Sequence, residues 1–336
     1  MKKVAFFDST LRDGSHAIKQ QLLPEHIENY CKSIDDAGMY TVIVGHGNGI
    51  GASSILMTRS AIDELDMIRL ARKNLKKTKL GVFVTVGFGT IAEQIKPALE
   101  IGTDVFCIAS HCTEVDVTQK HIKYLNEHGK EVFAVLMNIH LSNSENILNQ
   151  CLYAEEYGAD GVILMDSAGA YTPDETERTI SHLYNKLHIK IGFHPHNNLS
   201  MAVSNAFTAI KSGAAIIDGT VRGFGAGAGN CQLEALVALL KKMNIDTNMD
   251  LQIMLDTSST VINKLLGYAN GIDDISIISG YAGVVSTFKP QVERISNEYE
   301  VNPRDIFVEL GNRKVISGQD DLILEVAQYI KKSYNK

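Results

Sequence analysis

Two histidines in the segment Phe193-His194-Pro195-His196-Asn197-Asn198 have the spacing of metal ligands. Side chains at alternate positions of a β-strand point to the same side, so His194 and His196 can place two imidazoles on one cation. The alternative is that one of them is a hydrogen-bonded core residue, which is the commoner role of a lone histidine. Because the pair follows an apolar run, the pattern favours a metal site.

A second polar cluster directly follows the first apolar run of the chain, in the segment from Asp8 to His16. It offers a fixed cation, Arg12, together with carboxylates and an imidazole. Asp13 can complete a His-His-carboxylate set with open positions, which suits Mn2+, Mg2+ or Co2+ better than a structural zinc site. The alternative is that Arg12 and Asp13 form a surface ion pair or a turn.

The elements that must position these residues are short runs rich in β-branched and aromatic residues, recurring at regular intervals. The runs are Val4–Phe7, Tyr40–Val44, Leu80–Val86, Asp104–Ile108, Val132–Met137, Gly161–Met165, Ile189–Phe193 and Ala215–Val221. Their unbroken apolar character is typical of parallel strands buried on both faces. Eight strand-then-helix units predict a (β/α)8 TIM barrel as a catalytic domain over residues 1–245, with a doubly wound open sheet as the alternative.

Helix signals lie between these runs. Thr172-Pro-Asp-Glu175 predicts a helix start with a threonine cap and proline in the first turn, and two weaker starts are Ser142-x-x-Glu145 and Asp116-x-x-Gln119. The apolar face Val203, Ala206, Phe207 and Ile210 predicts a helix that ends at Gly213. Residues 246–336 lose the strand rhythm and predict a C-terminal helical region, with helices over Leu251–Leu266 and Leu322–Ser333.

Composition and charge argue against several classes of function. The net charge of −7 opposes nonspecific attraction to nucleic acid or to an anionic membrane, and no apolar stretch reaches the length of a membrane helix. The first apolar run is too short for a secretion signal. Five scattered cysteines without a Cys-x-x-Cys pair favour a reducing compartment, so we expect a cytoplasmic enzyme of small-molecule chemistry.

Gly-rich loops raise the possibility of dinucleotide binding, which the sequence does not favour. The loop from Gly45 to Gly51 does not follow the first strand with the spacing that dinucleotide binding requires. The loop Gly225–Asn230 can turn backbone N–H groups toward an anion, although tight turning explains its glycines equally well. We interpret the thiol of Cys231, which follows it, as structural.

Seven motifs spread over nearly the whole chain resemble the 4-hydroxy-2-oxovalerate aldolase family. They are Asp8-Ser-Thr-Leu-Arg-Asp-Gly-Ser-His-Ala17, His46-Gly-Asn-Gly-Ile-Gly-Ala-Ser-Ser54, His111-Cys-Thr-Glu-Val-Asp116, Asp166-Ser-Ala-Gly-Ala170, His194-Pro-His-Asn-Asn-Leu-Ser200, Gly225-Ala-Gly-Ala-Gly-Asn230 and Gly280-Tyr-Ala-Gly-Val284. The first and fifth are shared with isopropylmalate synthases and hydroxymethylglutaryl-CoA lyases. The second, third and last are more particular to the aldolases.

The resemblance implies a divalent metal, usually Mn2+, and cleavage of a 4-hydroxy-2-oxo acid to pyruvate and an aldehyde in aromatic hydrocarbon catabolism. It also implies a partner, an acylating aldehyde dehydrogenase, which the C-terminal region would contact while completing the site. The implied roles are metal ligands for Asp13, His194 and His196, enolate stabilisation for Arg12, general base for His16, and substrate contacts for Arg12, Ser167, His194 and Tyr281.

The chain departs from the family pattern at Asn48, at Asn197 and around the third strand end, where Phe83 and Thr85 stand in a stretch usually occupied by leucines. We therefore expect an altered preference among aldehydes. A Schiff-base aldolase would require a lysine at a strand end, and none of the eight runs ends in one. Two alternatives stay open: a Claisen-type acyl-CoA enzyme on the same barrel, and a noncatalytic barrel that keeps a structural metal.

Overall fold

The computed structural model describes residues 4–262 and 274–334, and within them eight parallel strands close a barrel in chain order. This confirms the predicted TIM barrel and excludes the doubly wound sheet. The strands are β1 (Ala5–Asp8), β2 (Thr41–Ile43), β3 (Lys79–Thr85), β4 (Val105–His111), β5 (Glu131–Met137), β6 (Gly161–Asp166), β7 (Lys190–Pro195) and β8 (Ile216–Gly219). Strand β1 pairs with both β2 and β8, which closes the ring.

Burial on both faces explains why the strand runs are apolar throughout. Neighbouring residues of β1 show this: Phe6 packs in the layer between strands and helices, whereas Phe7 lies in the barrel interior. Phe7 meets Phe133 of β5 edge to face across that interior, with ring centroids 5.0 Å apart. The interior is therefore a packed core that holds the strands rigidly beneath the site.

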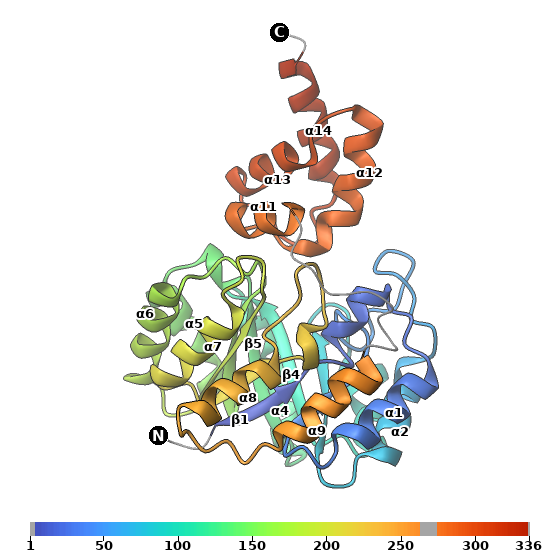
Figure 1. The fold of residues 1–336 in the computed structure, drawn as a ribbon, viewed down its shortest axis with the longest axis vertical. Helices are drawn as coiled ribbons and strands as arrows, with labels where there is room; N and C mark the ends of the chain where they lie inside the picture. Colours follow the sequence, from blue (N-terminus) through green and yellow to red (C-terminus); the bar gives the residue numbers. More distant parts are fainter. Residues whose placement is uncertain (1–3, 263–273, 335–336) are drawn as a thin grey trace.

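Helices surround the barrel (Figure 1). They are α1 (Pro24–Ile34), α2 (Glu64–Asn74), α3 (Lys96–Ile101), α4 (Gln119–Glu127), α5 (Ser144–Glu156), α6 (Pro173–Tyr184), α7 (Ala202–Lys211) and α8 (Leu233–Lys242). Thr172 caps α6 in a complete capping box, as predicted. Helix α7 also ends as predicted, because Gly213 follows it with a φ of 115°.

Two predicted helix starts were wrong by a few residues. Helix α5 is capped by Asn143, whose side chain accepts a hydrogen bond from the Asn146 N–H, and not by Ser142. Before α4 the chain forms a 3-10 turn over Val115–Thr118, so the helix begins at Gln119 and Asp116 caps nothing. At α5 the side chain of Asn143 therefore takes the capping role, whereas no side chain makes a capping hydrogen bond at the start of α4.

Helix α9 (Leu251–Thr257) packs beside α1 on the flank of the barrel (Figure 1). Its residue Met254 belongs to the same hydrophobic cluster as the barrel. The predicted helix Leu251–Leu266 is confirmed as helical as far as Ile262, because α9 is continued by a π-helical turn over Ser258–Ile262. The remainder of that prediction falls on residues 263–266, outside the described residues.

The C-terminal helices stand over one end of the barrel (Figure 1). They are α11 (Asp274–Ala282), α12 (Lys289–Tyr299), α13 (Pro303–Asn312) and α14 (Asp321–Tyr334), which share a hydrophobic cluster of their own. Helix α14 matches the predicted helix Leu322–Ser333. Asn198, after β7, donates to the Ser286 hydroxyl, and His140, after β5, contacts the Gly283 carbonyl. The helices therefore face the carboxyl ends of the strands; a domain division at residue 245 stays a prediction.

None of the helices in the two described ranges combines the length and the apolar character that crossing a bilayer requires.

The contribution of the capping box to the stability of α6 can be tested. We expect Thr172→Ala to lower the free energy of unfolding by about 1 kcal/mol, because the Glu175 N–H loses the Thr172 hydroxyl that it bonds at 3.3 Å. Urea unfolding of the full chain measures this. The matched control is Thr208→Ala inside α7. An equal loss in both variants would show that the cap contributes nothing.

Candidate active site

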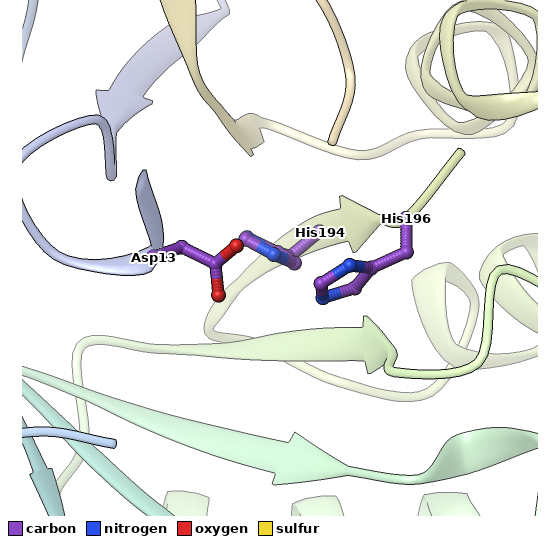
Figure 2. A group of neighbouring side chains, drawn as sticks. All are labelled: Asp13, His194 and His196. Carbon is purple, nitrogen blue, oxygen red and sulfur yellow. The ribbon is translucent and has the colours of Figure 1, made fainter. Parts of the chain in front are cut away.

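Three buried side chains converge where β1 and β7 end (Figure 2). Asp13 begins a 3-10 helix after β1, and His194 and His196 lie two residues apart at the end of β7, so the strand alternation predicted from sequence holds. One ligand atom from each lies within 4.8 Å of the other two. The exposed fractions are 3% for Asp13, 0% for His194 and 7% for His196. This set is a carboxylate and two imidazoles sharing one enclosed space.

The donor atoms of this cluster fit a divalent cation. His194 Nε2 and His196 Nδ1 are buried and have no hydrogen-bond partner, a costly state for polar atoms unless a ligand satisfies them. Burial lowers the pKa of His196 to about 4, which keeps a lone pair available near neutral pH. His194 Nδ1 lies 2.8 Å from Asp218 Oδ2, although not in good hydrogen-bond alignment. A carboxylate behind a histidine is the usual support of a metal ligand.

Asp13 is held as a carboxylate by its neighbours. Burial opposes its charge, but the Arg12 guanidinium at 2.8 Å and the nearby histidines hold the pKa of Asp13 well below its ordinary value. Asn230 donates to Asp13 Oδ2 at 2.6 Å from the Gly-rich loop after β8. A Cβ at Gly225 would lie 2.5 Å from the same oxygen, so this loop needs glycine to approach the site.

Arg12 lies between the cluster and the third strand. Its guanidinium carbon is 4.4 Å from the centroid of the Phe83 ring, and its Nη1 contacts the Gly47 carbonyl at 3.3 Å. The ion pair with Asp13 is therefore buried, and the alternative of a surface pair was wrong. Thr85, which like Phe83 departs from the family pattern, donates a hydrogen bond from its hydroxyl to the Asn48 carbonyl.

His16 belongs to the same 3-10 helix as Asp13. Burial lowers its pKa from the ordinary value, which favours the neutral imidazole. Its Nδ1 lies 3.1 Å from Gln20 Nε2, and a Cβ at Gly47 would lie 2.3 Å from its Nε2. The loop after β2 thus has a glycine where any side chain would collide with the imidazole.

The two remaining predicted residues lie in different surroundings. Ser167, directly after β6, accepts a hydrogen bond of 3.0 Å from the Asn138 N–H. Tyr281 lies in the last turn of α11 rather than in a turn of its own, and it is 76% exposed. It lines a cavity of 560 Å³, together with His140, Leu199 and Lys314, that does not include the three candidate ligands. The structure does not bring Tyr281 into contact with the three candidate metal ligands.

Sequence reasoning missed three residues that contact the site. Asp218 lies within β8, one residue before its end, and its Oδ1 accepts from the Ser9 hydroxyl at 2.7 Å. It is the polar residue at the end of an apolar strand, a signal that was available. Asn230 and Gln20 carry no comparable signal, because their roles depend on contacts between separate loops.

The comparisons with known proteins agree with this geometry. The HMGL-like family matches residues 3–261, and the DmpG-like communication domain matches residues 270–332. Among solved structures, the carboxyl transferase domain of Rhizobium etli pyruvate carboxylase has a TM-score of 0.83 at 14% identity, covering 99% of this chain and 61% of that one. The HMG-CoA lyase of Bacillus subtilis has a TM-score of 0.70 at 20% identity, covering 80% and 96%. These two likenesses concern the fold alone.

Curated relatives are similar over the full length. A 4-hydroxy-2-oxovalerate aldolase of Spirochaeta aurantia is 45% identical over 99% of this chain and 98% of the relative. One from Pectobacterium atrosepticum is 44% identical over 98% of this chain and 96% of the relative. Because both halves of the chain take part in these matches, the chain belongs to the HMGL-like family and, within it, to the 4-hydroxy-2-oxovalerate aldolases, which are carbon–carbon lyases.

Proposed function

We propose that this chain cleaves a 4-hydroxy-2-oxo acid of the 4-hydroxy-2-oxovalerate type to pyruvate and an aldehyde, with a divalent cation held by Asp13, His194 and His196. The observation that carries the proposal is the buried ligand set with Arg12 directly beside it. A structural metal would need no buried guanidinium. The aldolase names of the relatives favour this reaction over a Claisen-type acyl-CoA reaction.

A cation held by Asp13, His194 and His196 would supply Lewis acidity toward the 2-oxo acid group of the substrate. We propose Mn2+, with Mg2+ or Co2+ as the other candidates, because two imidazoles and one carboxylate form a borderline donor set. Asn230 orients the Asp13 carboxylate, and Asp218 lies behind His194. These supports fix the direction of the ligand atoms before any substrate arrives.

The chain's own groups provide the base and the positive charge that the cleavage needs. His16 takes the proton from the C4 hydroxyl, the C3–C4 bond breaks, and its electrons become the enolate of pyruvate. Arg12 presents a fixed positive charge to that enolate. Its planar group is held in place by Asp13 on one side and by the ring of Phe83 on the other.

We propose that Ser167 contacts the substrate. Its oxygen accepts from the Asn138 N–H at 3.0 Å, and its hydroxyl donates only over a long distance of 3.5 Å to the Met165 carbonyl, so a substrate oxygen can replace that acceptor. For Tyr281 the same role requires α11 to move toward the barrel from the position described above. This role, a part in aromatic hydrocarbon catabolism and an altered aldehyde preference from Phe83 and Thr85 stay predictions.

We further propose a partner and a location. The match of residues 270–332 to a communication domain supports association with a dehydrogenase, and we propose an acylating aldehyde dehydrogenase that takes up the aldehyde product. The five cysteines are all free and buried, which supports a reducing, cytoplasmic location.

Pyruvate release from a series of 4-hydroxy-2-oxo acids tests the reaction. We expect full-length protein treated with a chelator to release no pyruvate and added Mn2+ to restore release, because none of the eight described strands ends in a lysine that could form a Schiff base. Product formation from acetyl-CoA and a 2-oxo acid, without any aldol cleavage, would support the Claisen-type alternative instead.

Metal binding itself is measured by titration calorimetry with Mn2+. We expect Asp13→Ala to lose the binding while its far-UV circular dichroism stays unchanged, because the barrel core does not include the site. The control is Asp116→Ala, which removes an exposed carboxylate outside the cluster. If Asp13→Ala binds Mn2+ as tightly as the control does, the ligand assignment is wrong.

The roles of His16 and Arg12 can be separated. His16→Ala should lower kcat by about 100- to 10,000-fold and leave inhibition by oxalate, an enolate analogue, largely intact. Arg12→Lys should weaken oxalate inhibition, because an ammonium group cannot reproduce the planar fork. Surface controls are His128→Ala and Arg69→Lys. Equal losses of oxalate affinity in the two site variants would contradict this division.

A further inference from the structure

The amide of Gln20 is a buried polar group that contacts the proposed base, whose ring also hydrogen bonds the backbone of Gly47. Gln20 is 4% exposed, and its Nε2 lies 3.1 Å from His16 Nδ1. On its other side, Gln20 Oε1 accepts a hydrogen bond of 2.9 Å from the backbone N–H of Gly47. The Ser15 hydroxyl also lies within hydrogen-bond distance of Oε1. The amide thus bridges the imidazole and the loop after β2.

These contacts fix which way the amide points. A backbone N–H can only donate, so the amide atom that faces Gly47 must be the oxygen. The NH2 group therefore faces His16, and an NH2 group can only donate. His16 Nδ1 must then be the acceptor, which places the proton of the neutral imidazole on Nε2.

The backbone around Gln20 supports a specified orientation. Lys19 and Gln20 have φ values of 52° and 64°, in the left-handed region that residues other than glycine rarely occupy. The Gln20 carbonyl accepts a hydrogen bond of 3.2 Å from the Ala61 N–H. Such a conformation persists only where the surroundings hold it, so the position of the amide is set by the fold and not by a free side chain.

This tautomer has a chemical consequence. An imidazole with a proton on Nε2 and an occupied lone pair on Nδ1 can donate a proton but has no free lone pair to accept one. To accept a proton on Nε2, His16 must carry its first proton on Nδ1, and that N–H needs an acceptor. Gln20 offers one only if its amide turns over and gives up the Gly47 N–H.

We propose that Gln20 is a positioning residue that selects the protonated nitrogen of His16, holding the resting imidazole as the Nε2–H tautomer until the amide turns over. In the turned state Oε1 accepts from Nδ1–H, Nε2 takes the C4 hydroxyl proton, and the imidazolium then has both of its N–H groups in place. The proposal rests on the proposed function for the role of His16 as base. The resting tautomer rests on the hydrogen bonds alone.

Nitrogen NMR of the histidine rings tests the proposal. The full chain is labelled with 15N-histidine and loaded with diamagnetic Mg2+, and the His16 signals are identified by their loss in His16→Ala. At a pH where the ring is neutral, we expect a protonated Nε2 and an unprotonated Nδ1. In Gln20→Glu one carboxylate oxygen can accept from Gly47 and the other from the ring, so the proton should move to Nδ1.

The matched control is Gln21→Glu, which makes the same change at the adjacent, exposed residue and should leave the proton on Nε2. If Gln20→Glu does not fold, Gln20→Met removes both amide groups at similar size, and we expect its His16 signals to shift toward the Nδ1–H form. A wild-type proton on Nδ1, or an unchanged tautomer in the folded Gln20 variants, would overturn the proposal. Because this readout needs no turnover, absent pyruvate release would count against the proposed function and not against the tautomer.

Discussion

Burial of charge at the mouth of the barrel is the constraint on which the site depends. Asp13 and Asp218 are both buried carboxylates, and Arg12 is the guanidinium between them, 2.8 Å from the first and 4.0 Å from the second. Buried charges are costly unless they are paired and hydrogen bonded. The single positive charge of Arg12 does not balance the two carboxylates, so this group has a net negative charge. His194 and His196 face it with nitrogens that have no hydrogen-bond partner. A divalent cation satisfies both the charge and the open donor atoms.

The barrel brings these groups together without requiring a long loop to be ordered. Parallel strands deliver the residues after their carboxyl ends to one face, so ligands separated by some 180 positions in the chain meet without a long ordered loop. The glycines at 47 and 225 then let two loops come close to His16 and Asp13. The rigid apolar interior and the close-fitting loops together hold the ligand atoms in a fixed arrangement, which is what an electrostatic mechanism requires.

Much of the fold and of the site could be predicted from sequence, and the exceptions have different physical causes. The strands follow from short, unbroken apolar runs, and the His194–His196 pair follows from the alternation of side chains along a strand. The start of α5 was misplaced because the adjacent Asn143 caps it, and the start of α4 was misplaced because a 3-10 turn precedes that helix, which has no side-chain cap. Asn230 and Gln20 could not be foreseen, because each acts through a contact between loops that no local pattern encodes. Tyr281 is the opposite case. Its motif was recognised from sequence, yet α11 places it in a cavity that the three candidate metal ligands do not line.

The proposed site holds one divalent cation between Asp13, His194 and His196. Anomalous diffraction at the manganese edge, from crystals of the full chain soaked in Mn2+ and pyruvate, tests it most directly. We expect a single strong anomalous peak bounded by one Asp13 carboxylate oxygen and one nitrogen from each histidine, with pyruvate density beside it and toward Arg12. A peak elsewhere in the molecule, with none between these three side chains, would contradict it.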